Sequence, residues 1–108
     1  MSWHKVTLPF KDCGIAGKGK QLQDAFGVLL VANGGRPKDA ALFSQTSDDF
    51  EFVHYYFSPA AMQIAKELIE RWGGERCPTP VRTLRFALEV GNAGALDMLP
   101  PPKDWPSA

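Results

Sequence analysis

Residues 50–74, FEFVHYYFSPAAMQIAKELIERWGG, decide the fold. Aromatic residues and valine dominate the first eight positions, and these residue types favour β-strands. Successive side chains of a strand point to opposite faces of a sheet, so the strand has two faces of different composition. One face carries Phe50, Phe52, His54 and Tyr56, and the other carries Glu51, Val53, Tyr55 and Phe57. Because both faces are rich in strand-forming side chains, the pattern predicts an inner strand of a sheet.

The residues that follow predict a capped amphipathic helix. Ser58 is a favourable N-cap, and Pro59 occupies the first helical position, where its missing N–H costs nothing. Apolar side chains then recur within an arc of about 120° on a helix of 3.6 residues per turn; they are Ala61, Met62, Ala65, Leu68, Ile69 and Trp72. Gly73 and Gly74 end the helix, since glycine readily adopts a positive φ.

Hydrophobic patterning predicts one more helix and three more strands. The helix covers residues 21–33, and the strands cover residues 3–10, 40–46 and 81–90. The segment 21–33 has an alternative, because Gly27 costs a helix about 1 kcal/mol relative to alanine. If it is not helical, residues 25–32 (AFGVLLVA) would form a buried strand.

Polar and proline-containing segments predict the connections between these elements. Arg36–Asp39 and Ser47–Asp49 have the composition of turns. Residues 75–80 (ERCPTP) are expected to form a loop, because their two prolines disrupt regular structure. Residues 91–108 are rich in glycine, alanine and proline and predict a disordered tail.

The predicted element order is β-α-β-β-α-β. This order is that of the ferredoxin-like, split β-α-β arrangement, an α+β fold with a four-stranded antiparallel sheet and both helices on one face. Residues 1–90 would form this single domain. The second face of the sheet would be bare unless another molecule covers it, which predicts a homodimer or a small apolar or anionic ligand on that face.

Composition argues against several classes of protein. The 12 basic and 12 acidic residues give a net charge of zero, so nothing favours a polyanionic partner such as nucleic acid. The N-terminus lacks the pattern of a signal peptide, and the longest apolar run, near Val28–Ala32, is far below the roughly 20 residues that span a bilayer. The two cysteines, without close spacing, suit a reducing compartment, so we expect a cytoplasmic protein without a membrane partner.

The aromatic strand carries the first candidate site. His54 shares a face with Phe52 and Tyr56, and in the predicted topology Lys5 and Arg85 lie on strands beside it. Histidine can act as a general acid or base, and arginine can hold an anionic group. This set predicts a ligand site with Phe52, Tyr56 and Lys5. In the alternative, an enzyme would use His54 for proton transfer and Arg85 to hold its substrate; a single histidine among aromatic residues is more commonly structural.

A glycine-rich segment carries the second candidate site. Residues 14–21 (GIAGKGKQ) match the spacing of a phosphate-binding loop between a strand and a helix, in which Lys18, Gly19 and Lys20 would contact an anion. However, Gln21 stands where such loops carry the serine or threonine that binds magnesium. The alternative is a lysine-rich loop without a ligand.

Two further readings are weaker. Residues 50–55 (FEFVHY) have the aromatic spacing of an RNA-recognition strand, but Asp48 and Asp49 precede them and would repel phosphate. The histidines and cysteines, His4, His54, Cys13 and Cys77, are too scattered for a zinc site. The sequence therefore predicts neither a metal nor a cofactor.

Overall fold

The computed structural model describes residues 2–35 and 39–105. Its strands are β1 (Trp3–Pro9), β2 (Leu42–Thr46), β3 (Phe52–Phe57) and β4 (Glu75–Cys77), and its α-helices are α1 (Lys18–Ala32), α2 (Pro59–Arg71) and α3 (Val81–Glu89). Three short 3-10 helices cover Phe10–Asp12, Ala93–Met98 and Pro102–Asp104. No helix in the described ranges is long and apolar enough to cross a membrane.

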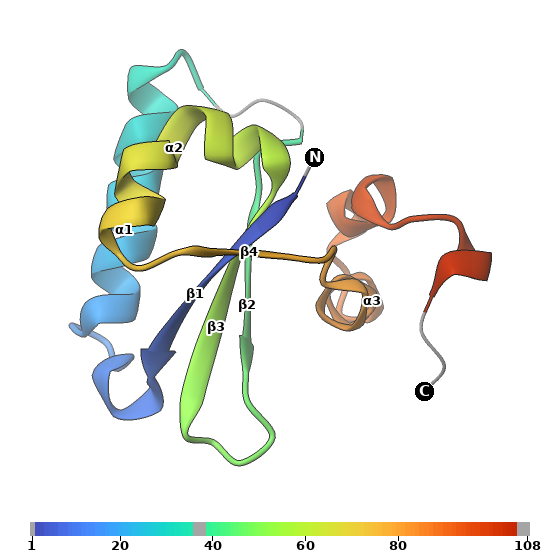
Figure 1. Cartoon of the computed structure of the whole chain (residues 1–108), viewed down its shortest axis with the longest axis horizontal. Coiled ribbons are helices and arrows are strands. Elements are labelled where there is room, and N and C mark those ends of the chain that lie inside the picture. Colours follow the sequence, from blue (N-terminus) through green and yellow to red (C-terminus); the bar gives the residue numbers. More distant parts are fainter. Residues whose placement is uncertain (1, 36–38, 106–108) are drawn as a thin grey trace.

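The strands form one four-stranded sheet in the order β2-β3-β1-β4. Every neighbouring pair is antiparallel. The prediction of an α+β protein with a four-stranded antiparallel sheet is therefore confirmed, and β3 is an inner strand as expected. Helices α1 and α2 cover one face of this sheet, and α3 lies on the other (Figure 1).

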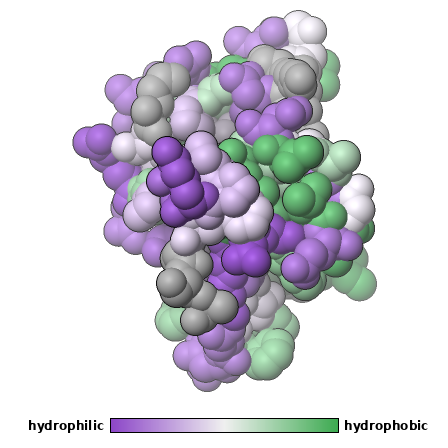
Figure 2. All heavy atoms as spheres, turned by 90° about the vertical axis from the view of Figure 1, so that its right-hand side faces the viewer, coloured by the Kyte–Doolittle hydropathy of each residue, from purple (hydrophilic) through white to green (hydrophobic). Residues whose placement is uncertain are grey.

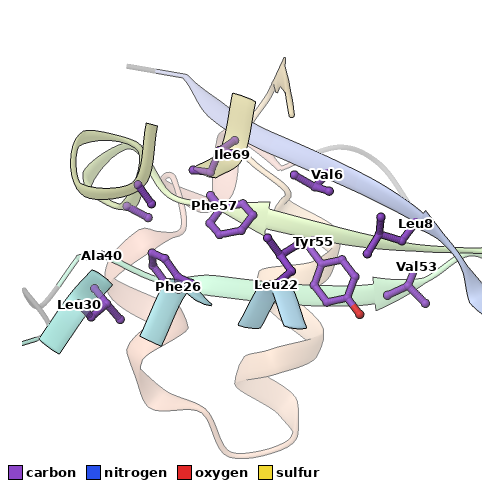
Figure 3. Close-up of a cluster of buried hydrophobic side chains, with 12 residues drawn as sticks. Val6, Leu8, Leu22, Phe26, Leu30, Ala40, Val53, Tyr55, Phe57 and Ile69 are labelled. Carbon is purple, nitrogen blue, oxygen red and sulfur yellow. The ribbon is translucent and has the colours of Figure 1, made fainter. Parts of the chain in front are cut away.

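The main core lies between the sheet and the pair α1 and α2 (Figure 3). Strand β3 contributes Val53, Tyr55 and Phe57, and α1 contributes Leu22, Phe26 and Leu30. The Phe26 and Phe57 rings meet edge to face, with centroids 5.3 Å apart, a geometry that aromatic pairs favour. The face of β3 that carries Val53, Tyr55 and Phe57 therefore points towards the two helices.

Residues 21–33 are helical rather than a buried strand. Helix α1 starts three residues earlier than predicted, at Lys18, and ends at Ala32. Leu22, Phe26 and Leu30 are spaced at i, i+4 and i+8, so they form one buried stripe. Gly27 has open space around it, so its helix cost is not offset by a packing requirement.

Helix α2 begins as the sequence predicts. The Ser58 hydroxyl oxygen accepts the backbone N–H of Ala61 at 3.3 Å, and Pro59 follows at the first helical position. Gly73 ends the helix with a φ of 81°. The helix is kinked at Ala65, whose φ and ψ are −121° and 27°.

The prediction of a strand at residues 81–90 is wrong, because Val81–Glu89 form α3. The apolar residues in this segment alternate, but they also fit a helix, in which Val81, Leu84 and Leu88 fall on one face. The structure uses the helical pattern: Val81 and Leu84 are buried, while Phe86 and Val90 are 59% and 67% exposed.

The fourth strand instead lies in the segment that was predicted to be a loop. Glu75–Cys77 form β4 and pair with the start of β1, with Trp3 opposite Cys77 and Lys5 opposite Glu75. The strand is only three residues long and stops before Pro78, which has no N–H to donate. A strand this short gives no alternation that sequence patterning can detect.

The second face of the sheet is covered in part by α3 and the segment that follows it. Trp3, Phe43, Leu84 and Ala95 form a second buried cluster there. The sequence predicts a disordered tail from Gly91, whereas its described part, to Trp105, contains two 3-10 helices and buries Ala95 completely. Ala95 packs in the cluster with Trp3 and Leu84, where its small side chain fits. At this position alanine therefore serves packing and does not indicate disorder.

The turns between the elements differ in detail from those predicted from the sequence. The β2–β3 turn extends to Glu51, so β3 starts at Phe52 rather than Phe50. Phe50 adopts a φ of 59° and is 68% exposed. Of the turn predicted at Arg36–Asp39, residues 36–38 lie outside the described residues.

Candidate functional site

The aromatic strand presents His54 and Tyr56 to the side of the sheet that carries α3. This follows from β3 register, since Val53, Tyr55 and Phe57 point into the main core. In the sheet, Thr7 of β1 lies opposite His54 and Lys5 lies opposite Tyr56. The predicted site on β3 is therefore on the second face, but α3 now covers part of it.

His54 and Tyr56 line a cleft of about 750 Å³ between the sheet and the start of α3. The β2–β3 hairpin forms one wall, and the β4–α3 loop with the first turn of α3 forms another. Pro100 and Asp104 of the C-terminal segment close a third side. The remaining lining is mixed: Thr46, Ser47, Thr79 and Thr83 contribute hydroxyl groups, and Pro78, Pro80 and Val81 contribute apolar surface.

His54 is held by a neighbour on β1. Its Nδ1 lies 2.9 Å from the Thr7 hydroxyl oxygen, so Nε2 is the ring nitrogen left for another partner. Burial lowers the pKa of His54, and the positive charge of Lys5 lowers this pKa further, while Asp49 raises it. The imidazole is therefore neutral at neutral pH and can donate or accept one hydrogen bond at Nε2.

Tyr56 and Thr83 join the sheet to α3 at the cleft. Thr83 is buried, and its hydroxyl hydrogen-bonds the Gln45 side-chain oxygen of β2. The Tyr56 hydroxyl also interacts with Thr83, and burial raises the pKa of this phenol. These contacts fix the first turn of α3 against the sheet.

Arg82 is a cleft residue that sequence reasoning missed. It lies in the first turn of α3, and its guanidinium donates to the Asp48 carboxylate on the hairpin at 3.2 Å. Both side chains are largely exposed, so this pair contributes little to stability. A helical reading of residues 81–90 would have placed Arg82 at a helix N-terminus, but the strand reading placed it on a sheet face.

Of the other predicted residues of this site, the structure places Lys5 beside Tyr56 but leaves Arg85 and Phe52 apart from the cleft. Arg85 lies outside the cleft on α3, with its guanidinium 4.7 Å from the centre of the Trp105 ring. Lys5 interacts with Glu75 at 3.9 Å and acts on His54 through its charge. Phe52 is 45% exposed and does not line the cleft.

The glycine-rich segment packs closely against its surroundings. A Cβ atom on Gly19 would lie 2.1 Å from the Tyr55 hydroxyl oxygen, and one on Gly17 would lie 2.1 Å from the Asp12 carbonyl oxygen. Lys18 approaches Asp12 at 4.0 Å, and Lys20 contacts Asp24 at 2.8 Å. Close packing accounts for both glycines, and both lysines have carboxylate neighbours, so no further observation favours a phosphate loop.

In the part of the chain that the structure describes, no three histidine, cysteine, aspartate or glutamate side chains gather as metal ligands would. No protein-family model matches the sequence, and neither the curated proteins nor the solved structures contain a significant match.

Proposed function

We propose that this protein binds a small anionic ligand, with a carboxylate or phosphate group, in the cleft between His54 and Arg82. The observation that carries the proposal is the meeting of the first turn of α3 with His54 on one cleft. The first N–H groups of a helix lack acceptors within the helix and carry partial positive charge. A ligand anion at this position would meet the Arg82 guanidinium, the His54 imidazole and the helix N–H groups that follow Val81, whose own N–H donates to the Thr79 carbonyl. The Asp104 carboxylate also lines the cleft and would have to lie away from the anion.

The size and lining of the cleft support a small polar ligand. Ligand pockets commonly enclose about 300–1,000 Å³, and this cleft encloses about 750 Å³. The hydroxyl groups of Thr79 and Ser47 would supply neutral hydrogen bonds. Arg82 and these hydroxyl groups are the reason that we favour an anionic ligand over the apolar ligand that the sequence also allowed, although three prolines and two carboxylates also line the cleft.

The Asp48 carboxylate must release Arg82 for this ligand to bind. Asp48 is 80% exposed, and its pair with Arg82 is solvated, so the exchange costs little. A ligand anion with access to the helix N-terminus has partners that Asp48 lacks. Dimerisation across this face, the other expectation, would require α3 to move, which is why we favour the ligand.

We also infer that the fold is the ferredoxin-like split β-α-β arrangement. The order β1-α1-β2-β3-α2-β4, the strand order β2-β3-β1-β4 and the two helices on one face support it. Helix α3 would then be an addition to this fold, and the cleft lies where the addition meets the sheet.

A second candidate is an enzyme that uses His54 as a general base. The specific observation is that the lowered pKa keeps the imidazole neutral, as a base must be at neutral pH. The assay would be hydrolysis of p-nitrophenyl phosphate and p-nitrophenyl acetate by the purified protein and by the His54→Gln variant. Equal rates for the two proteins would remove His54 as a base for these reactions.

The binding proposal can be tested by thermal unfolding in the presence of small mono-, di- and tricarboxylates and phosphates. A ligand that binds only the folded state raises the Tm in a concentration-dependent manner. We expect Arg82→Gln to lose this rise. Arg71→Gln is the matched control, because Arg71 is an exposed residue in the last turn of α2 and does not line the cleft. The same rise in both variants would refute the proposed site.

A further inference from the structure

Strand β2 forms one edge of the sheet, and its outer side has no strand beside it in the described ranges. Two backbone hydrogen bonds lie at the two ends of the β2–β3 pair. The Ser47 N–H donates to the Phe52 carbonyl, and the Ser58 N–H donates to the Ala41 carbonyl. Along an antiparallel strand, every second residue directs its N–H and C=O groups to the same neighbour. Because Ala41 and Ser47 bond to the β3 side, Phe43 and Gln45 between them also bond to β3. Leu42, Ser44 and Thr46 therefore direct their N–H and C=O groups outwards.

This edge lacks the features that usually block pairing with another chain. Natural proteins protect exposed edges with lysine, proline, bulges or inward-pointing charges, whereas β2 reads LFSQT. Hollows flank the strand on both sides: one of about 200 Å³ towards α1 and one of about 610 Å³ towards α3. The edge is accessible to an extended partner.

We propose that a second copy of this chain pairs with β2 through its own β2, forming a continuous eight-stranded sheet across a two-fold axis. The outward groups are centred on Ser44, so the axis would pass beside this residue. Ser44 would pair with Ser44 of the second copy, and Leu42 with Thr46. A symmetric antiparallel register of this kind uses all three outward positions.

The surface beside the edge fits a second copy in charge and shape. On α3, the hollow next to β2 is lined by Arg82, Arg85, Phe86 and Glu89. Arg82 is already paired with Asp48 of its own copy. A two-fold axis brings the same surface of each copy together, so the positive Arg85 of one copy would face the negative Glu89 of the other. Figure 2 shows hydrophobic side chains gathered on one side of the α3-bearing face, and α3 contributes the exposed Phe86 to the edge.

Helix α1 also leaves room for the approach. Gly27 borders the hollow between α1 and β2, and it has no neighbour within 4 Å of the position of a Cβ. Its missing side chain lets another backbone come close. We favour a second copy over an unrelated peptide for two reasons. The positive and negative side chains beside the edge can pair with those of an identical surface, and β2 can pair with itself in a symmetric register.

The test is the mass of the full chain by light scattering over a concentration series, with Ser44→Pro and Ser44→Thr. Proline at this position removes an outward N–H and no bond to β3, whereas threonine keeps the N–H. We expect a concentration-dependent dimer for the wild type and Ser44→Thr, and a monomer with a native circular dichroism spectrum for Ser44→Pro. A wild-type monomer at all concentrations, or a dimer that a folded Ser44→Pro retains, would overturn the proposal.

Cross-linking provides a readout that does not depend on the proline variant folding. Facing residues of a bonded antiparallel pair have Cα atoms about 5.5 Å apart, within the range that a disulfide spans. Mild oxidation should therefore link Ser44→Cys into a dimer, but not the wild type, which has partly buried Cys13 and Cys77. Glu67→Cys, on the exposed side of α2, is the matched control. Equal yields from both cysteine variants would contradict the β2 interface.

Discussion

Lys5 carries a positive charge close to His54 and repels the imidazolium that forms when His54 is protonated. The two residues lie on neighbouring strands, β1 and β3, and share the face that carries the cleft. Burial is the largest cause of the low pKa of His54, and the Lys5 charge is the second. Because a nearby positive charge disfavours the imidazolium, Lys5 helps to keep His54 neutral.

We therefore predict that Lys5→Met raises the pKa of His54. The substitution removes the positive charge and keeps most of the aliphatic chain, so burial of His54 should change little. Proton NMR titration of the His54 ring measures the shift, and Lys66→Met, on the exposed side of α2, is the control. A His54 pKa that is unchanged in Lys5→Met would show that the Lys5 charge does not contribute to it.

Two glycines of α1 have opposite packing environments. A Cβ on Gly19 would collide with the buried Tyr55 hydroxyl, whereas a Cβ on Gly27 would enter open space. We predict that Gly19→Ala destabilises the protein by about 1–3 kcal/mol through overpacking. Gly27→Ala should stabilise it by about 1 kcal/mol, because alanine favours the helix.

Urea denaturation of both variants measures these free energies of unfolding. Opposite signs are expected, although both substitutions replace a glycine by an alanine in one helix. If Gly19→Ala were as stable as Gly27→Ala, the close approach of α1 to Tyr55 would be wrong.

At the scale of elements, the three α-helices end in the same way. Gly34, Gly73 and Gly91 each adopt a positive φ directly after the C-cap. In each case the N–H of the next residue returns to a carbonyl of the last turn, as Asn92 does to Ala87 at 2.9 Å, which is the Schellman motif. The sequence identified the stop at Gly73, but it assigned Gly91 to the start of a tail because the segment before it was predicted to be a strand.

Helix α2 depends on Ser58 for more than its cap. The hydroxyl oxygen accepts the N–H of Ala41 at 2.9 Å, and the hydroxyl donates to the Asp39 carbonyl at 2.6 Å. We predict that Ser58→Ala costs about 2–4 kcal/mol, since it removes the cap and leaves buried polar groups without a partner. Ser44→Ala, at an exposed position, should change stability little when measured by the same denaturation.

For the whole molecule, patterning predicted most of the sheet and only part of the site. Val53, Tyr55 and Phe57 define a buried face by alternation alone, and Ser58 with Pro59 defines a helix start. Residues 81–90 fit both periods, and the helix is the one that buries Leu84 in the cluster with Trp3 and Phe43. The cleft exists because α3 lies on the sheet, so Arg82 and Thr83 could not be placed beside His54 without that tertiary contact.

The C-terminal segment completes both the second cluster and the cleft. Trp105 donates its indole N–H to the Pro100 carbonyl at 2.9 Å and stacks with Arg85. We predict that a chain ending at Leu99 still folds, because Met98 and Leu99 remain packed on the second cluster. Loss of the cation–π contact should cost about 1 kcal/mol and should speed amide hydrogen exchange in α3.

A chain ending at Trp105 is the control for this truncation, since it keeps both contacts. Hydrogen exchange measured by mass spectrometry compares α3 with α1 in the two chains. Equal protection of α3 in both would show that the segment does not support this helix.

In the proposed site, His54 and the start of α3 bind one anion together. The most direct measurement is the pKa of His54 by NMR, with and without inorganic phosphate, in the wild type and in Arg82→Gln. Because an anion near the ring favours the imidazolium, we predict that phosphate raises this pKa in the wild type and raises it less in the variant. A His54 pKa that phosphate leaves unchanged in the wild type, or shifts equally in both proteins, would contradict the claim.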